Sequence, residues 1–309
     1  MKTDDYTPEG IRLETTQNHR YTDTADGLYA AMAEEAICEA VAVRCDTAHN
    51  LYVEFPCGEG IIPREEGAAG IAEGSTRDIA LLARVGKPVC FVVSAIERSA
   101  DGTVRALLSR REAQRRCRRD KVAHLTTGDI VSARVTRLEP FGAFCDIGCG
   151  LSALLPIAAL SVSRIAHPSD RLTVGQDIFA VVSSLADGRV CLSMRELLGT
   201  WEENAAQFSA GDTVAGIVRS VESYGIFVEL MPNLAGLAEL RTGVTPGTAA
   251  GVYIKSILPE RMKIKLAIVD TYPAPTGLRP LPYTQTSGHI SHWEYTPIGA
   301  EKRIFSEFS

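Results

Sequence analysis

Three stretches of the chain each combine ring side chains with a basic residue, a set of groups that suits a nucleobase and its phosphate. Aromatic rings stack on bases, at about 1–3 kcal/mol per base, and a nearby cation reaches the phosphate backbone. The chemistry implied is binding rather than bond making. The residues, stretch by stretch, are His49, Tyr52 and Arg105; Phe141, Phe144 and Arg189; and Tyr224, Phe227 and Lys263.

Each of these residues also has an ordinary explanation. A single exposed ring is common on protein surfaces, and a surface cation can simply pair with a carboxylate on the neighbouring strand. Repetition of the set at equivalent places is what favours a binding role. His49 is a weaker stacking surface than the rings that take its place later in the chain.

Internal repeats supply the elements that must position these residues. The segment "GDTVAGIVRSVESYGIFVELMPNLAGLAEL" (211–240) follows the plan of "GDIVSARVTRLEPFGAFCDIGCGLSALLPI" (128–157), and "HNLYVEFPCGEGIIP" (49–63) is a fainter copy. Each copy continues into an apolar, β-branched run and then a short closing strand: "RALLS" (105–109), "RVCLS" (189–193) and "KIKLA" (263–267). Each unit therefore contains five short predicted strands with turn signals between them, which is typical of a small closed barrel.

Strand alternation predicts which way the rings point. In the middle copy Ala143, Cys145 and Ile147 share one face, whereas Phe144 shares the other with Asp146. The other two copies repeat this pattern. In the C-terminal copy Phe227 shares a face with Glu229, and in the first copy Tyr52 shares a face with Glu54. Because a face that carries an acid is expected to be the solvent face, we predict that these rings are exposed. Phe141 and Tyr224 precede a glycine that permits a twist or bulge turning them outward too.

The charge is unevenly distributed. The net charge is −6, which argues against binding nucleic acid by bulk electrostatics alone. The run "RREAQRRCRRD" with Lys121 (110–121) nevertheless carries seven basic and two acidic residues, 7 − 2 = +5, on a predicted helical linker. A solvated helix face is the ordinary interpretation, and a phosphate-contacting role is the alternative.

No catalytic or metal-binding motif is visible, so no catalytic residue, metal or cofactor is expected. Cys145 and Cys149 in "CDIGC" flank a turn, and strand parity favours a core position for Cys145 rather than a ligand role. His289 and His292 have no third ligand nearby, which favours structural or exposed roles. Without a signal peptide, a membrane span or paired cysteine motifs, a cytoplasmic protein with no membrane partner is expected.

The middle copy resembles a known family. Its "FGAF" box, its "GLSALLP" strand and its closing "GRVCLS" strand are similar to the RNA-binding domain named after bacterial ribosomal protein S-one, which occurs in tandem in that protein. Residues 127–197 match well, 211–270 match with a shortened middle, and 34–114 match weakly. The linker "GTWEENAAQFSAGD" (199–212) also resembles those between consecutive domains of that protein.

This resemblance implies five-stranded OB-fold barrels and assigns roles to individual residues. Phe141, Phe144 and Arg189 would form the middle RNA site, and Tyr224, Phe227 and Lys263 the C-terminal one. In the first copy only Tyr52 and Arg105 survive clearly, with His49 in a ring position. Where many family members have a histidine, this chain has Pro156 and Glu239, so a polar contact is missing and Glu239 would repel phosphate.

Together these observations predict an all-β chain of three tandem five-stranded OB-fold barrels joined by short helical linkers. We expect it to bind single-stranded RNA, above all mRNA, in translation, with no preference for DNA and with the small ribosomal subunit as a further partner. The alternative is a protein-interaction scaffold that docks on the ribosome or on an RNA-processing complex. The expected segments are an N-terminal arm (1–33), a degenerate barrel (34–114), a basic linker (115–126), an RNA-binding barrel (127–197), a linker (198–210), a second RNA-binding barrel (211–270) and a Pro-rich tail (271–309).

Overall fold

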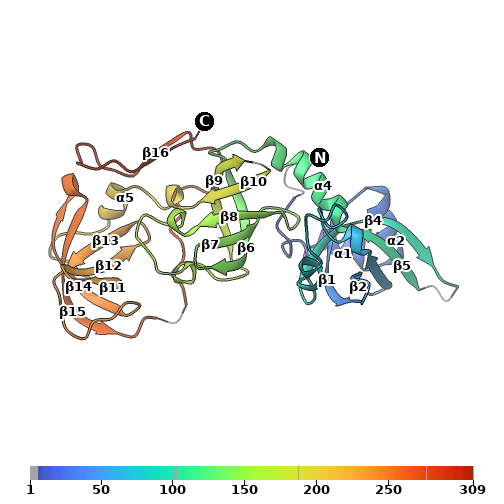
Figure 1. Ribbon diagram of the computed structural model, residues 1–309, viewed down its shortest axis with the longest axis horizontal. Helices are drawn as coiled ribbons and strands as arrows, with labels where there is room; N and C mark the ends of the chain where they lie inside the picture. The colour runs from blue at the N-terminus through green and yellow to red at the C-terminus, as the bar shows by residue number, and fades with distance from the viewer. Residues whose placement is uncertain (1–5, 101–102, 187, 276, 309) are drawn as a thin grey trace. The chain divides into compact units, whose positions relative to one another are not determined.

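Three closed β-barrels account for most of the chain (Figure 1). The computed structural model describes residues 6–100, 103–186, 188–275 and 277–308. The chain divides into two compact units: residues up to Leu125 with Asp146–Ser152 form the first, and Thr126–Cys145 with the residues from Ala153 onward form the second. The predicted all-β class and the three five-stranded barrels are therefore confirmed.

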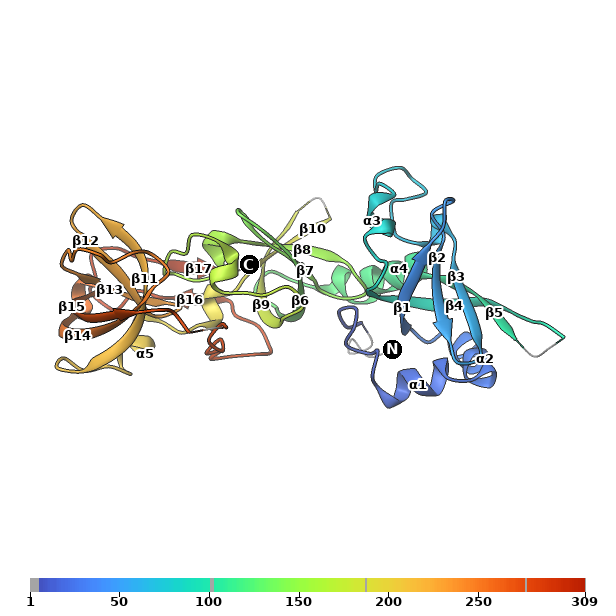
Figure 2. The same ribbon diagram turned by 90° about the horizontal axis from the view of Figure 1, so that it is seen from below.

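The first unit contains the N-terminal barrel, whose strands pair in the order β1-β2-β3-β5-β4 (Figure 2). Two helices precede the barrel, and α2 buries Leu28 and Ala31 in the barrel core. The expected N-terminal arm thus contains two helices after an irregular stretch (6–15), and its first five residues lie outside the described part. The strands are β1 (Cys38–Cys45), β2 (Leu51–Phe55), β3 (Gly58–Ile62), β4 (Pro88–Arg98) and β5 (Val104–Ser109); the helices are α1 (Thr16–Thr22), α2 (Ala25–Ala33), α3 (Ile79–Leu82) and α4 (Arg110–Asp120), with short turns η2 (Arg64–Glu66) and η3 (Val122–His124).

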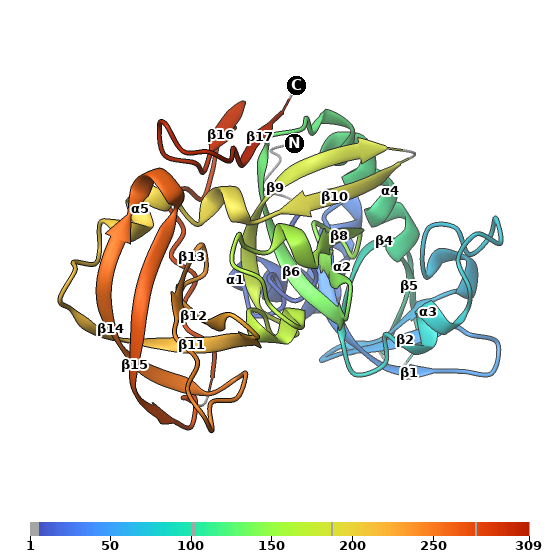
Figure 3. The same cartoon turned by 60° about the vertical axis from the view of Figure 1, so that its left-hand side comes forward.

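The second unit contains the other two barrels, which share one topology. The middle barrel orders its strands β10-β8-β7-β6-β9, and the C-terminal barrel β11-β12-β13-β15-β14 (Figure 3). Their strands are β6 (Ile130–Glu139), β7 (Gly142–Asp146), β8 (Ser152–Pro156), β9 (Asp177–Ala186) and β10 (Arg189–Ser193), then β11 (Thr213–Glu222), β12 (Gly225–Met231), β13 (Leu234–Ala238), β14 (Ala249–Leu258) and β15 (Lys263–Tyr272). Between and around them lie α5 (Trp201–Ala205), η4 (Ile157–Ala159), η5 (Pro168–Asp170), η6 (Arg195–Leu197) and η7 (Pro259–Arg261).

Alternation along the strands builds each core as the sequence predicts. Ala143 and Cys145 of β7 are fully buried, as are Ile226 and Val228 of β12. The residues between them, Phe144 and Phe227, lie on the other side of their strands and are half-buried. The barrel walls therefore present these rings on the outside.

The C-terminal tail packs back onto the second unit. Trp293 and Tyr295 join the hydrophobic cluster of the C-terminal barrel, where they meet Trp201 of α5. The backbone N–H of Trp201 donates to the carbonyl of Tyr295 at 3.0 Å. The tail ends in the two-stranded sheet of β16 (His292–Glu294) and β17 (Phe305–Glu307). The segment boundaries expected from the sequence remain a prediction.

Candidate nucleic-acid interface

The predicted ring residues lie together as pairs in two of the barrels. Phe141 and Phe144 meet edge to face with ring centroids 6.0 Å apart and an interplanar angle of 89°. Tyr224 and Phe227 repeat this arrangement at 6.1 Å and 87°. The first ring of each pair is well exposed, 54% for Phe141 and 68% for Tyr224. Two barrels thus present the same L-shaped aromatic surface to solvent.

A glycine inside each pair makes this arrangement possible. A Cβ on Gly142 would lie 2.5 Å from the carbonyl oxygen of Leu155, and a Cβ on Gly225 would lie 2.7 Å from that of Ala238. Any side chain there would push the next strand away, because atoms cannot approach so closely. The glycine therefore lets the neighbouring strand lie close behind the two rings.

The acids that share a strand side with Phe144 and Phe227 are buried, which corrects the argument from strand parity for these two copies, whereas Glu54 beside Tyr52 is exposed. Asp146 is only 3% exposed and Glu229 5%. Asp146 accepts hydrogen bonds from the N–H groups of Glu9, Gly148 and Gly150. These acids do not mark a solvent face, and the exposure of the rings has to be taken from the structure itself.

Two arginines account for the burial of Glu229. Arg171 donates to both Glu229 carboxylate oxygens at 2.8 Å, and Arg219 donates to the same oxygens at 3.0 and 3.1 Å. Burial alone would raise the pKa of Glu229, but the two guanidinium groups hold it below its ordinary value. A carboxylate paired in this way is a structural anchor in the wall of the C-terminal barrel.

The C-terminal barrel carries a groove beside its ring pair. The groove has a volume of about 570 Å³ and is lined by Tyr224 and Phe227 at one side and by Lys255, Lys263 and Lys265 at the other. Lys265 lies in register with Leu237, which in turn lies opposite Phe227. The predicted cation Lys263 is thus joined by two lysines that sequence reasoning missed. Lys265 alternates with Lys263 along the same strand, so parity could have found it.

The middle barrel lacks the extra lysine. Arg189 begins β10, is exposed, and forms no ion pair within the described residues. The position equivalent to Lys265 is Cys191, which lies in register with Leu154. The guanidinium of Arg137 lies over the Phe144 ring at 4.6 Å from its centroid and also pairs with Glu139 at 3.2 Å. One face of this ring is therefore already covered.

In the C-terminal barrel the equivalent place is left open. Ser220 lies opposite Phe227 across the β11–β12 pair, in the position that Arg137 takes in the middle barrel. A serine side chain is too short to cover a ring. Among the described residues, no cation lies over Phe227, in contrast to Phe144.

The first barrel has residues at the equivalent positions, but its ring Tyr52 and its cation Arg105 already contact neighbouring side chains. Arg44 lies over the Tyr52 ring at 3.5 Å, and the Tyr52 hydroxyl donates to Asp46 at 3.0 Å. Arg105 donates twice to Glu59, at 3.0 and 2.8 Å, which is the ordinary surface ion pair. His49 adopts a left-handed backbone conformation and takes part in no ring contact among the described residues.

Comparison with known proteins identifies the barrel type. Residues 124–195, which span the middle barrel, match the model of the S1 RNA binding domain. The middle barrel is an S1 domain. The match begins and ends close to the limits of β6–β10, and it contains the Phe141–Phe144 pair and Arg189.

Curated ribosomal proteins match parts of the chain. The chain is 36% identical to small ribosomal subunit protein bS1 of Leuconostoc lactis over 119 residues, which cover 38% of this chain and 28% of that protein. It is 30% identical to bS1 of Staphylococcus aureus (strain COL) over 187 residues, covering 55% and 48%. The chain thus spans about half or less of the curated relatives that it matches. A solved multidomain protein with nucleic acid binding domains from Streptococcus pneumoniae aligns over 78% of this chain and 75% of that one, at 12% identity and a TM-score of 0.25.

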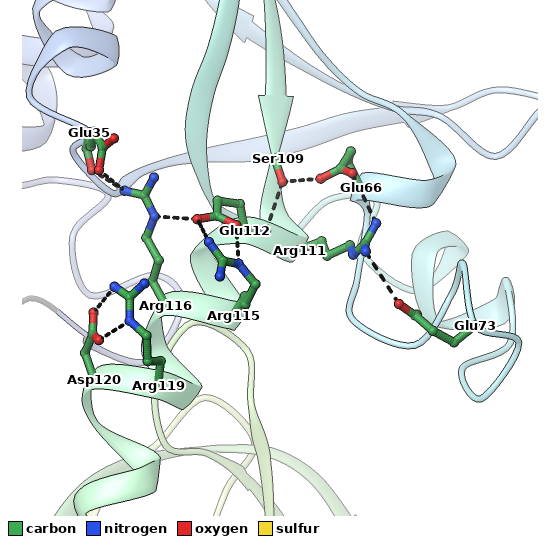
Figure 4. A network of polar contacts seen from close by, with 10 residues as sticks. All are labelled: Glu35, Glu66, Glu73, Ser109, Arg111, Glu112, Arg115, Arg116, Arg119 and Asp120. Carbon is green, nitrogen blue, oxygen red and sulfur yellow. Dashed lines mark hydrogen bonds and ion pairs between the residues drawn. The ribbon is translucent and has the colours of Figure 1, made fainter.

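Most arginines of the basic helix that precedes the S1 domain are paired with acids of their own unit (Figure 4). Arg115 and Arg116 both donate to Glu112, and Arg119 donates to Asp120. Salt links on the same helix lower the pKa of Glu112 to about 2, chiefly through Arg115. Apart from Arg110, which is buried, the arginine run is therefore largely a paired helix surface, which supports the ordinary interpretation of this charge cluster.

The other candidate residues, the cysteines and histidines, do not gather into a metal site within the described part of the chain. Within the described residues, no group of three or more histidine, cysteine, aspartate or glutamate side chains could hold a metal ion. None of the eight cysteines forms a disulfide, and Cys145 is fully buried in the S1 domain, as predicted. His289 pairs with Asp129 at 2.9 Å. Among the described helices, none has the length and apolar character needed to cross a membrane.

Proposed function

We propose that this protein binds single-stranded RNA through its middle and C-terminal barrels and that it acts in translation, with mRNA as its main ligand. The observation that carries the proposal is the repeated edge-to-face ring pair at Phe141–Phe144 and Tyr224–Phe227, which in the C-terminal barrel shares a groove with exposed lysines. The bS1 relatives support the link to translation. The S1 domain match supports RNA as the ligand.

Binding works without bond making. Two bases stack on each ring pair, while Arg189 in the middle barrel and Lys263 in the C-terminal barrel contact phosphates. Sites on two barrels of one chain raise the effective concentration of one site for an RNA already held by the other, so modest affinities combine into avidity. Stacking needs unpaired bases, and a duplex therefore binds less well.

The test removes one ring from each pair in the full chain. Phe144→Ala with Phe227→Ala is expected to weaken binding of a fluorescent single-stranded RNA by at least about 30-fold, because each lost stacking contact costs about 1 kcal/mol or more. Tyr52→Ala is the matched control, since that ring is covered by Arg44. Unchanged affinity in the double variant would overturn the proposal.

A second candidate function is docking on the ribosome, above all on the small subunit. It is favoured by the first barrel, where Tyr52 and Arg105 are engaged by neighbouring side chains while apolar Leu107 stays exposed on the same strand as Arg105. We place this activity in the cytoplasm, with the ribosome. Co-sedimentation with ribosomes that persists in the double phenylalanine variant would show that docking and RNA binding use different surfaces.

A further inference from the structure

The outer face of the C-terminal barrel extends beyond the ring pair and its groove. On β14 the outward residues are Tyr253 and Lys255, both exposed, while Val252 and Ile254 point into the core. Strand β14 lies beside β15, which carries Lys263 and Lys265 (Figure 3). Tyr253 is 42% exposed. Tyr253 is thus an exposed ring that lies outside the RNA site proposed above.

Strand register places Tyr253 across the basic strand from the ring pair. Tyr253 lies opposite Ala267 of β15. Ala267 is two residues beyond Lys265, which shares a row with Leu237 and Phe227. From β12 through β13 and β15 to β14 is three strand spacings, about 14 Å along the barrel wall. Because Ala267 has only a methyl side chain, nothing large on β15 stands beside Tyr253 in its row.

Glu239, an acid that lines the groove, is neutralised. Glu239 directly follows β13, is exposed, and accepts a hydrogen bond from the Lys255 ammonium at 2.7 Å. This pairing lowers the pKa of Glu239. Lys255 lies at an irregularity where the β14 pairing shifts between Ile254 and Ser256. Lys263 and Lys265 remain as cations without an acid partner among the described residues, so the path keeps a positive charge.

We propose that the RNA path on the C-terminal barrel crosses β15 and continues onto β14, where Tyr253 stacks one further base. The inference rests on the proposed function, because it extends the same site. A single OB-fold barrel covers about 4–16 nucleotides of a single strand, whereas the pair Tyr224 and Phe227 serves two bases. Tyr253 supplies a platform for a base beyond the lysines, and the lysines hold the phosphates between.

The test compares two RNA lengths in the full chain carrying Phe144→Ala, so that the middle barrel contributes little. The probes are fluorescent oligouridylates of four and ten nucleotides. Tyr253→Ala is expected to weaken binding of the ten-nucleotide probe by about 5- to 150-fold, the loss of one stacked base, and to leave the four-nucleotide probe unchanged. Tyr253→Phe keeps the ring and is expected to restore binding.

Tyr272→Ala is the matched control. Tyr272 is 40% exposed and ends β15, five residues beyond Ala267, and its loss is expected to change neither probe. If Tyr253→Ala behaves like Tyr272→Ala while Phe227→Ala still weakens both probes, the extension onto β14 is wrong and the proposed function stands. If Phe227→Ala also has no effect, the proposed function itself fails.

Discussion

The unpaired lysines of β15 should determine how steeply RNA binding depends on salt. Lys263 and Lys265 are exposed on the groove side of the C-terminal barrel and have no carboxylate partner within the described residues. On a single strand, each neutralised phosphate contributes about 0.7 to the slope of log affinity against log salt. Replacing both lysines by glutamine should therefore reduce the slope by about 1.4. Between 50 and 200 mM salt this corresponds to about a 7-fold difference in the affinity lost.

Arg105 is the matched control for this prediction. It begins the closing strand of the first barrel in the place that Lys263 takes in the C-terminal barrel, but it is bound to Glu59 by two hydrogen bonds of 3.0 and 2.8 Å. A cation that is already neutralised releases no counterion from RNA, so Arg105→Gln should leave the slope unchanged. The assay is fluorescence anisotropy with a ten-nucleotide single-stranded RNA at several KCl concentrations. An unchanged slope in the lysine double variant, or an equal decrease with Arg105→Gln, would refute the reasoning.

Three further predictions concern stability, measured by urea unfolding of the full chain. Burial raises the pKa of Glu39 to about 7, so between about pH 4.5 and 7 the folded state keeps a proton that the unfolded chain loses. The free energy of unfolding is therefore highest below about pH 4.5 and decreases as the pH rises to 7. Glu39→Gln should flatten the fall in stability between pH 5 and 7.5, which is on the order of 3 kcal/mol, and an equally steep fall would contradict this. Gly142→Ala should cost about 1–3 kcal/mol, because its Cβ would lie 2.5 Å from the Leu155 carbonyl oxygen; an unchanged midpoint would be the contrary result. Glu229→Gln should cost about 3 kcal/mol or more, since the buried Arg171 loses its counter-charge, and a loss below about 1 kcal/mol would show that the ion pair is not needed.

Strand parity was enough to predict the barrels and the direction of most core residues. Ala143, Cys145 and Val228 follow the two-residue period and are buried. The period is local, and the same local pattern recurs in all three copies, so the sequence could be interpreted copy by copy. For the same reason the ring pairs could be located before their geometry was known.

Parity could not predict what happens to the acids beside the rings. Asp146 is buried because the backbone of Glu9, 137 positions earlier, donates to it, and Glu229 because Arg171, 58 positions earlier, does. Such pairings depend on tertiary contacts that no local pattern encodes. Likewise, the sequence gives no sign that Arg44 covers Tyr52 or that Ser220 leaves Phe227 open.

Lys255 was missed for a different reason. It lies where the β14–β15 pairing shifts, and such an irregularity changes which residues face each other without a clear signal in sequence. Lys265, in contrast, could have been predicted, since it follows Lys263 at strand period in "KIKLA".

The comparison of single-stranded and duplex RNA tests the central claim most directly. The wild-type chain is titrated with one fluorescent RNA, alone and annealed to its complement, at constant salt. Stacking on Phe144 and Phe227 requires bases that are not paired with a complementary strand. We therefore expect the single strand to bind at least about 10-fold more tightly than the duplex, which corresponds to the loss of about one stacking contact. Equal affinity, or a preference for the duplex, would contradict base stacking as the mode of binding.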